Sequence, residues 1–301
     1  MYDGPIIDAH HHMWDLALGK HPWLTPADGS VEALGSLQEL RQTYVVADYL
    51  RDAAGHDVVA TVHIEALWDR DSDPVDETRW LEGLDKSGGV ATRYVAFAPL
   101  IDPQVEPVLA AQAAFDRVVG IRDILSWHPD PAKRFAERGD IIDDPAWRRG
   151  LALLERYDLG FDLMIYPYQA AQAARLAADF PGLRFLLNHC GSPVDRDDEG
   201  MQRWRDGLQL LGAQPNVAIK ISNLGAYDPE WTYESLREVT LWCIECFGTA
   251  RSMFASDYPV ARMQMSYDEV YGTFKRIASD FTPAEQRAMF HDNARRSYRF
   301  D

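Results

Sequence analysis

The sequence is poor in cysteine, in long apolar runs and in positive charge, and each shortage excludes a class of protein. Its three cysteines, Cys190, Cys243 and Cys246, are too few and too unevenly spaced for a disulfide framework. No run approaches the ~18 apolar residues of a membrane span, and the first ten residues lack the basic segment and apolar core of a secretion signal. We therefore expect a cytoplasmic protein without a membrane partner.

Basic residues are outnumbered by acidic ones. The chain has 30 lysines and arginines against 47 aspartates and glutamates, which gives a net charge of −17. The electric field of this negative charge repels polyanions, so we expect no nucleic-acid partner. We expect a small-molecule ligand instead, and any anionic group on it would need locally placed cations. A homo-oligomer is compatible with the sequence, which carries no sign of the subunit number.

The pair Cys243-x-x-Cys246 has the spacing of a zinc or redox motif, but a second ligand pair is missing. The pair lies in residues 231–248, where apolar residues recur at helical spacing. We therefore predict that these cysteines are helix residues of the hydrophobic core and do not form a metal site.

What the sequence has instead is a regular alternation of strand and helix signals. Eight apolar, β-branched runs are each followed by a helical segment, at residues 5–10, 57–66, 93–100, 117–125, 160–167, 184–189, 216–222 and 252–257. Such alternation is typical of a parallel sheet covered by helices, and eight units predict an α/β fold, a (β/α)8 TIM barrel. One barrel domain would take residues 1–301. The alternatives are an open doubly wound sheet and two smaller domains, and the count of eight argues against both.

In a parallel barrel, functional side chains gather at the C-terminal ends of the strands. On the first strand this places His10 and His12 on one face, because side chains alternate along a strand. The other strand ends carry a ring of polar residues: Glu65, Arg122, Tyr166, Tyr168, His189, Lys220 and Asp257. Burying charged groups without partners is costly, so this ring indicates a functional site. The structural alternatives are that Arg122 pairs with Asp123 and that Lys220 only neutralises Glu65 or Asp257.

Four motifs, taken in order, resemble one known family. DAHHHMW at residues 8–14, NHCGSP at 188–193, KIS at 220–222 and ASDYPV at 255–260 resemble the amidohydrolase-related (amidohydrolase 2) proteins. Within that family they resemble the lactonase branch, which includes L-fucono-, L-rhamnono- and 2-pyrone-4,6-dicarboxylate lactonases of carbohydrate or aromatic catabolism. The resemblance runs from about residue 5 to the NARRSY stretch at 293–298. It implies a distorted (β/α)8 barrel, hydrolysis of a small lactone, and catalytic roles for His10, His12, His189 and Asp257.

The ligand set that the wider superfamily uses for metal ions is incomplete in this chain. That set joins the His-x-His pair and the eighth-strand aspartate with a fifth-strand histidine, and binuclear members add a fourth-strand lysine or glutamate. Residues 160–169 contain no histidine, and residues 118–125 contain neither lysine nor glutamate. His10, His12 and Asp257 still suffice for one zinc ion with water in the open position. We therefore predict either no required cofactor or a single, weakly held zinc ion.

For lactone opening, we predict that Asp257 is the base that deprotonates water and later returns the proton to the leaving alkoxide. The three histidines of the motifs would polarise the carbonyl group and stabilise the oxyanion. The substrate-binding candidates are Arg122, Lys220, Glu65, Trp14, Trp68, Tyr166 and Tyr168, with Trp23 nearby. The cations would bind a carboxylate and the rings would stack on the lactone. With one or two candidate cations, a monocarboxylate or hydroxylated lactone is favoured over a dicarboxylate.

Two other functions stay open from the sequence. A zinc-dependent decarboxylase of an aromatic or unsaturated acid would share the first- and eighth-strand residues, but it needs metal, and the missing fifth-strand histidine counts against it. A non-catalytic barrel that binds a small ligand is the alternative from another class. The presence of the base together with all the polarising histidines counts against that interpretation.

Overall fold

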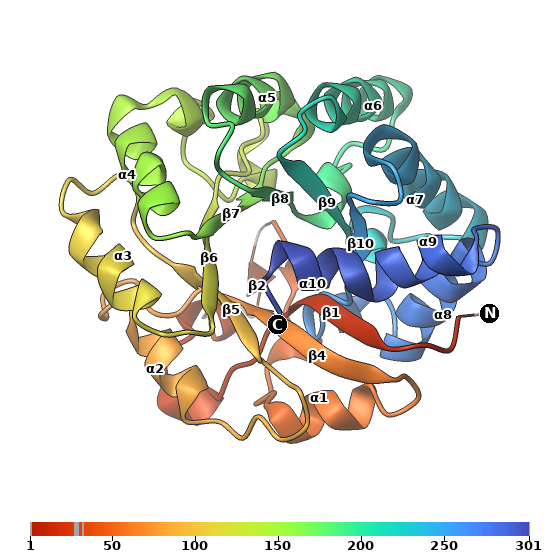
Figure 1. Ribbon diagram of the computed structural model, residues 1–301, viewed down its shortest axis with the longest axis horizontal. Coiled ribbons are helices and arrows are strands. Elements are labelled where there is room, and N and C mark those ends of the chain that lie inside the picture. The colour runs from red at the N-terminus through yellow and green to blue at the C-terminus, as the bar shows by residue number, and fades with distance from the viewer. Residues whose placement is uncertain (1, 27–29, 32, 301) are drawn as a thin grey trace.

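The protein is an eight-stranded parallel barrel surrounded by helices (Figure 1), as the computed structural model shows for residues 2–26, 30, 31 and 33–300. Its strands are β1 (Ile6–His11), β4 (Val58–Ile64), β5 (Arg93–Phe97), β6 (Val118–Ile124), β7 (Gly160–Met164), β8 (Phe185–Leu187), β9 (Val217–Ile221) and β10 (Ser252–Phe254). They neighbour one another in chain order, so the strand order does not reverse as it does in a doubly wound sheet. The predicted (β/α)8 fold is confirmed, and each of these eight barrel strands overlaps a predicted run.

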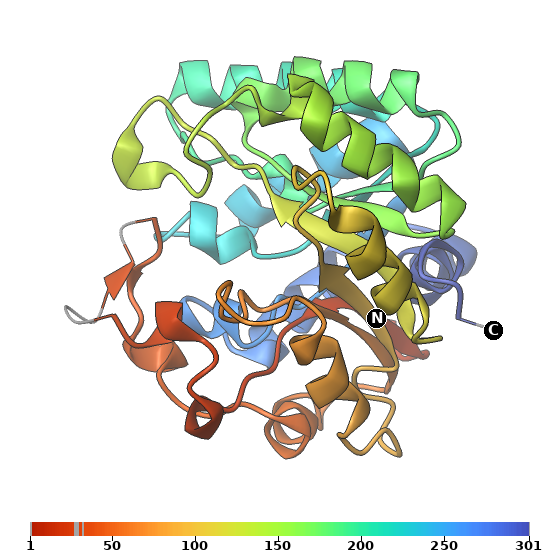
Figure 2. The ribbon, with the colours of Figure 1, turned by 90° about the vertical axis from the view of Figure 1, so that its left-hand side faces the viewer.

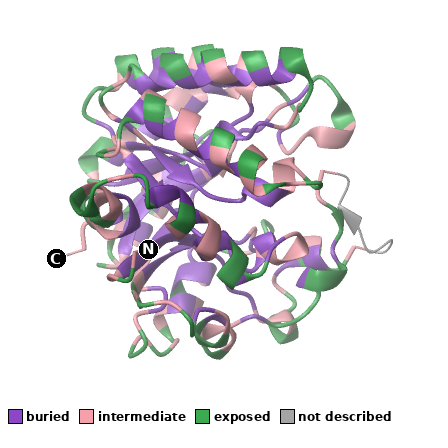
Figure 3. Cartoon of the chain, turned by 90° about the vertical axis from the view of Figure 1, so that its right-hand side faces the viewer, coloured by how far each residue is buried: buried purple, intermediate pink, exposed green. Residues whose placement is uncertain are grey.

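Eight helices follow the eight strands and cover the outside of the barrel. They are α1 (Val46–Asp52), α2 (Asp76–Glu82), α3 (Val105–Ala113), α4 (Pro145–Arg156), α5 (Ala170–Asp179), α6 (Asp198–Gly212), α7 (Tyr233–Phe247) and α8 (Tyr267–Ala278). Their inner faces are buried and their outer faces exposed (Figure 3), as expected for amphipathic helices on a barrel. The start of α4 is set locally, because the Asp144 side chain accepts a hydrogen bond from the Ala146 N–H and Pro145 occupies the first helical position.

The two ends of the barrel differ. The chain finishes with α9 (Pro283–Arg287), a π-helical turn (Ala288–Asp292) and α10 (Asn293–Ser297), and α10 lies across the end where the strands begin (Figure 1). There Ala294 and Tyr298 pack among the interior side chains. The connections that follow the strands gather at the opposite end, away from both termini (Figure 2). The longest of them carries the antiparallel pair β2 (Ser30–Val31) and β3 (Gly35–Ser36).

The barrel closes irregularly between its last strand and its first. The closing hydrogen bonds come from residues just beyond β10: the Asp257 N–H donates to the His10 carbonyl oxygen, and the His12 N–H donates to the Tyr258 carbonyl oxygen, both at 2.8 Å. The buried Asp8 carboxylate holds this seam, because it accepts hydrogen bonds from the backbone N–H and the hydroxyl of Ser256. The seam therefore sets Asp257 beside the histidines of the first strand.

The predicted helix cysteines lie on α7. Cys243 is buried and Cys246 is half-buried, and all three thiols of the chain are free. Neither α7 cysteine belongs to a cluster of metal-ligating side chains among the described residues. In that same part of the chain, no helix combines the length and the apolar character that crossing a membrane requires.

Gly150 marks a very close approach of α4 to the connection that follows β5. A Cβ added there would lie 2.0 Å from the carbonyl oxygen of Leu100, a backbone atom that no rotamer change moves. We expect Gly150→Ala to lower the free energy of unfolding by about 1–3 kcal/mol, although alanine is the better helix former. Gly272 on α8 is the matched control, because nothing lies within 4 Å of its added Cβ. Gly272→Ala should raise the same quantity by up to about 1 kcal/mol. Urea unfolding measures both changes, and a stabilised Gly150→Ala protein would contradict the packing argument.

Candidate active site

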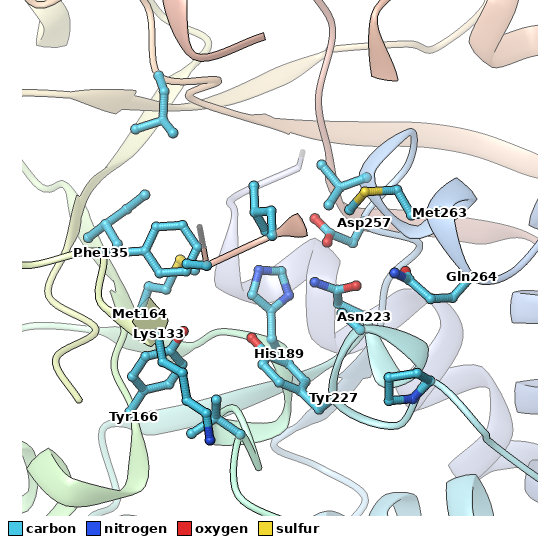
Figure 4. Close-up of a pocket in the computed structure, with 18 of the residues that line it drawn as sticks. Lys133, Phe135, Met164, Tyr166, His189, Asn223, Tyr227, Asp257, Met263 and Gln264 are labelled. Atoms are coloured by element: carbon cyan, nitrogen blue, oxygen red, sulfur yellow. The ribbon is translucent and has the colours of Figure 1, made fainter. Parts of the chain in front are cut away.

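A cavity of roughly 450 Å³ opens at the end of the barrel where the strands finish. The polar residues that line it include His12, Arg122, His189 and Asp257, which lie at or just beyond the ends of four different strands. Much of the remaining wall is apolar and comes from Trp23, Leu34, Phe135, Met164, Val260 and Met263. The side chains of His189 and Asp257 face the same space (Figure 4). This volume, with an apolar wall and a few convergent polar groups, suits a small ring-shaped ligand.

Three potential ligand atoms converge at the inner end of the cavity. His10 Nε2 lies 3.2 Å from His12 Nε2, and both nitrogens lie 3.3 Å from Asp257 Oδ1. Ligands at about 2.0 Å from a tetrahedral zinc ion are about 3.3 Å apart, so the triangle matches one face of such a site. By distance alone, these three residues can hold one metal ion.

Asp257 is a buried carboxylate with an unpartnered oxygen. Its side chain is 2% exposed, and Oδ1 has no hydrogen-bond donor among the described residues. The residue has a left-handed backbone conformation, with φ at 57°. Burial raises the pKa of Asp257, against the effect of the neighbouring His189, Arg122 and Lys220. A carboxylate with a raised pKa and a free oxygen on a cavity suits a general base.

His12 and His10 are both neutral imidazoles with defined hydrogen-bond contacts. The Nδ1 of His12 lies 2.8 Å from the carbonyl oxygen of Ile64, to which it donates. The Nδ1 of His10 lies 3.3 Å from Lys220 Nζ. Burial lowers the pKa of His12 to about 3 and that of His10 well below its usual value. Neither ring is charged at neutral pH. The effect of each ring on the site therefore depends on which of its nitrogens carries a hydrogen and donates and which one accepts.

Lys220 is a fully buried lysine that forms an ion pair with Asp162. Burial lowers the pKa of Lys220 to about 8, and the Asp162 carboxylate opposes this shift. The ammonium form therefore still predominates at neutral pH. Asp162 also accepts hydrogen bonds from the Tyr298 hydroxyl, at 3.1 Å, and the Asn188 amide, at 3.2 Å.

Arg122 is held against the cavity by Glu65. Its Nε donates to Glu65 Oε1 at 2.9 Å and its Nη2 donates to the Glu65 carbonyl oxygen at 2.6 Å. Among the described residues, the hydrogen-bond contact of its Nη1 is with the sulfur of Met164, at 4.0 Å, so this nitrogen has N–H groups for a ligand. Burial would raise the pKa of Glu65, but Arg70 and Arg122 outweigh it and hold that pKa at about 2. Glu65 is therefore ionised and fixes the arginine.

His189 is presented by a left-handed turn after β8, with φ at 51°. Its Nδ1 lies 2.9 Å from the hydroxyl oxygen of Ser222, which orients the ring and leaves Nε2 for the cavity. Burial lowers the pKa of His189 to about 4. A neutral imidazole in this position can donate a hydrogen bond to a carbonyl oxygen of a ligand.

The predicted site residues do not all reach the cavity. Those that line it are His12, Arg122, Tyr166, His189 and Asp257, together with Trp23. Behind this wall, Glu65 contacts the lining residue Arg122 and His10 contacts the lining residue His12. Lys220 lies one residue further back, where it contacts His10 and Asp162. Arg122 pairs with Glu65 and not with Asp123, whose carboxylate accepts from Trp147. Lys220 pairs with Asp162 and with neither alternative partner expected from the sequence.

Three predicted aromatic residues are occupied elsewhere. Trp14 is fully buried in the first loop and donates to the Gln42 carbonyl oxygen. Trp68 packs against His21, and the Tyr168 hydroxyl donates to Asp195. None of the three is among the residues that line the cavity. Substrate binding by them, and by Glu65 and Lys220, stays a prediction.

Sequence reasoning missed residues that loops bring to the cavity. Figure 4 labels Lys133, Phe135, Asn223, Tyr227, Met263 and Gln264 among them, and Asp195 is another. Asp195 joins three of these loops, because it accepts hydrogen bonds from Lys133, His128 and Tyr168. The only available signal was that Asn223 directly follows the KIS motif. Asn223 has a left-handed conformation, which asparagine tolerates better than most residues.

Comparison with known proteins adds a family to this geometry. A family model described as amidohydrolase matches residues 7–300. An uncharacterised protein of Sinorhizobium fredii is 37% identical and covers 99% of this chain and 100% of its own. An L-fucono-1,5-lactonase of Burkholderia multivorans is 30% identical over 97% of this chain and 95% of its own. Among solved structures, a zinc-bound amidohydrolase from Burkholderia multivorans superposes with a TM-score of 0.82 at 24% identity, covering 99% of this chain and 100% of that one.

Proposed function

This chain belongs to the amidohydrolase family, and on that premise we propose that it is a hydrolase that opens a small lactone, with Asp257 as the base that activates water. The observation that carries the proposal is the unpartnered, buried Oδ1 of Asp257 at a cavity that also presents donors from Arg122 and His189. The relative named as an L-fucono-1,5-lactonase supports the choice of an ester substrate.

The proposed reaction uses three groups of the cavity wall. Asp257 takes a proton from a water molecule, whose oxygen attacks the lactone carbonyl carbon. Nη1 of Arg122 and Nε2 of His189 donate to the developing oxyanion. The tetrahedral intermediate then breaks its bond to the ring oxygen, which receives the proton from Asp257, and the product is an open hydroxy acid. Positioned proton transfer of this kind contributes about 10²- to 10⁴-fold.

For the first-strand histidines we propose a different role from the polarising one predicted for them, because of the direction of their hydrogen bonds. His10 does not line the cavity, and His12 presents the bare Nε2 of a ring whose Nδ1 donates to Ile64. A zinc ion fits the triangle of ligand atoms in size, but Nδ1 of His10 faces the Lys220 ammonium, which can only donate. His10 therefore does not offer the lone pair that metal binding needs, and the proposed mechanism contains no metal step.

The proposed substrate class is a hydroxylated lactone, such as a sugar-acid lactone. Asn223 and Gln264 both line the cavity, and their side-chain oxygens are buried acceptors without donors among the described residues. Hydroxyl groups can donate to such acceptors, whereas a second carboxylate brings only further acceptors. Two other lining cations, Lys133 and Arg196, are already paired with Asp195 and Asp228. Arg122 is thus left as the main cation for a ligand.

Gln264→Met tests this substrate class without changing the size of the side chain. We expect kcat/KM for a hydroxylated aldonolactone to fall by about 3- to 10-fold, the worth of one neutral hydrogen bond. For an unsubstituted lactone such as δ-valerolactone, we expect little change. Met263→Leu at the neighbouring lining position is the matched control, because it alters packing alone. Equal losses for both substrates would contradict a hydrogen bond to Gln264.

The function itself is tested by a screen in which pH indicators report lactone opening. Aldonolactones, muconolactone-type compounds and a dicarboxylate lactone are compared with and without chelator, beside metal analysis of the purified protein. We expect turnover of hydroxylated lactones that survives chelation. Activity that disappears on chelation and returns with one equivalent of zinc would overturn the metal-free mechanism. Release of carbon dioxide from an aromatic acid would indicate a decarboxylase. Tight ligand binding that is unchanged by Asp257→Asn, without turnover, would indicate a non-catalytic barrel.

A further inference from the structure

One continuous row of buried hydrogen bonds runs behind the cavity from β9 to β4. It begins at Lys220 Nζ, passes 3.3 Å to Nδ1 of His10, then 3.2 Å from Nε2 of His10 to Nε2 of His12, and ends 2.8 Å further at the Ile64 carbonyl oxygen. The three side chains are buried, so water does not compete for these contacts. Each imidazole uses both of its nitrogens in the row.

The Ile64 end of this row fixes the direction in which its hydrogen bonds are donated. A carbonyl oxygen only accepts hydrogen bonds, so Nδ1 of His12 must carry the hydrogen. In a neutral imidazole the other nitrogen is then a bare acceptor. Nε2 of His12 can therefore take part only if Nε2 of His10 carries a hydrogen and donates.

The Lys220 end independently fixes the same direction. Lys220 is paired with the Asp162 carboxylate, and its ammonium group has donors but no lone pair. Nδ1 of His10 must therefore be the bare nitrogen, which again places the hydrogen of this ring on Nε2. The two ends agree, and every nitrogen in the row has a partner of the correct type.

We propose that Lys220 is a positioning residue that holds His10 in its Nε2–H form, so that His10 serves as a hydrogen-bond donor to His12 and not as a metal ligand. Metal-binding histidines normally donate their second N–H to a carboxylate or a carbonyl group, which leaves the ligating nitrogen bare. Here the Lys220 ammonium group lies where that acceptor would be, so Nδ1 of His10 is the bare nitrogen and Nε2 carries the hydrogen. A metal ion at His10, His12 and Asp257 would have to break the row and would lie close to the Lys220 ammonium group.

The row also accounts for the free oxygen of Asp257. Although Nε2 of each imidazole lies 3.3 Å from Oδ1, one nitrogen donates to the other and the second has no hydrogen. Oδ1 therefore receives no hydrogen bond from either ring, although both lie close to it. The proposal concerns the resting site and does not depend on which substrate is turned over.

The direct test is the protonation pattern of His10 in chelator-treated protein. Two-bond ¹H–¹⁵N correlation spectra of protein labelled at histidine nitrogens distinguish a protonated from a bare ring nitrogen, and His10→Gln identifies the signals. We expect His10 to be protonated at Nε2 and His12 at Nδ1. A His10 ring protonated at Nδ1 in this unaltered, metal-free protein would overturn the proposal. This measurement requires no variant of Lys220 to fold.

The second test is zinc affinity, measured by competition with a chelating dye. Lys220→Met combined with Asp162→Asn removes the cation together with its counter-charge, so no unpaired ion is buried. We expect this double variant to bind zinc about 10- to 100-fold more tightly than the unaltered protein, the usual size of such neighbour effects on a metal site. Tyr298→Phe is the matched control, because it removes a different contact to Asp162 and leaves Lys220 in place. Equal zinc affinities for the double variant and this control would also overturn the proposal.

Discussion

Asp257→Asn is expected to lower kcat by about 10²- to 10⁴-fold while the barrel stays folded. The amide has the shape of the carboxylate but cannot accept a proton from water. For the unaltered enzyme, burial raises the pKa of Asp257, so the reactive ionised form is lost as the pH falls through a value above the ordinary aspartate range. The acid limb of the kcat/KM profile should therefore lie at a higher pH than an ordinary aspartate would give.

The same substitution should not destabilise the protein. A carboxyl group whose pKa is raised by folding contributes stability at low pH, where it is protonated, and this contribution is lost as the pH rises through the raised pKa. Asparagine stays neutral at every pH. As the pH rises from about 4 to neutrality, we therefore expect the free energy of unfolding of the variant to increase relative to that of the unaltered protein. Urea unfolding at several pH values measures this difference. An inactive variant that is also unfolded would point to a structural role, and a fully active one would exclude the base.

Arg122→Met is expected to have the second large effect, on activity and on stability together. It removes an oxyanion donor, for which we expect a loss of about 10²-fold or more in kcat. It also leaves the buried Glu65 carboxylate with Arg70 as its remaining cation. Removing one partner of a buried ion pair lowers the free energy of unfolding by about 3–5 kcal/mol. Because Glu65 keeps its contact with Arg70, we expect a loss at the lower end of that range.

A double variant separates the two effects. Adding Glu65→Gln to Arg122→Met removes the uncompensated charge, so most of the lost unfolding free energy should return while kcat stays low. Arg156→Met is a matched control, because this arginine pairs with Glu106 on the surface, where ion pairs contribute little. If the double variant regained activity, Arg122 would act only through stability and the oxyanion role would be wrong.

Zinc chemistry at this site depends on a contact between residues of two motifs, and neither motif by itself predicts that contact. The DAHHHMW stretch and Asp257 supply three ligand atoms at zinc-like separations, which is the arrangement that the motifs predict. The residue that opposes metal binding is Lys220, through its bond to His10. Its counter-ion Asp162 lies on β7, in the strand from which the expected metal-binding histidine is missing.

The sequence alone determined the barrel and which strand-end residues meet at one cavity. Eight apolar runs separated by helices specify eight parallel strands, because backbone pairing and burial repeat locally along the chain. The rule that side chains meet where parallel strands end then brought His12, Arg122, His189 and Asp257 to one cavity. These inferences need only periodicity and strand order, both of which are local properties.

Only the tertiary structure decided which partner each charged residue has. Arg122 and Asp162 are direct neighbours across the β6 and β7 pairing, yet Arg122 pairs with Glu65 on β4's end and Asp162 pairs with Lys220 on β9. The choice depends on side-chain directions across the barrel and on backbone positions such as the left-handed Asp257. The loop residues Asn223 and Gln264 also reach the cavity only in the folded protein, because irregular loops have no sequence periodicity from which their path could be predicted. Strand order follows from local patterning, whereas hydrogen-bond partners and their direction follow from distances that exist only after the barrel has closed.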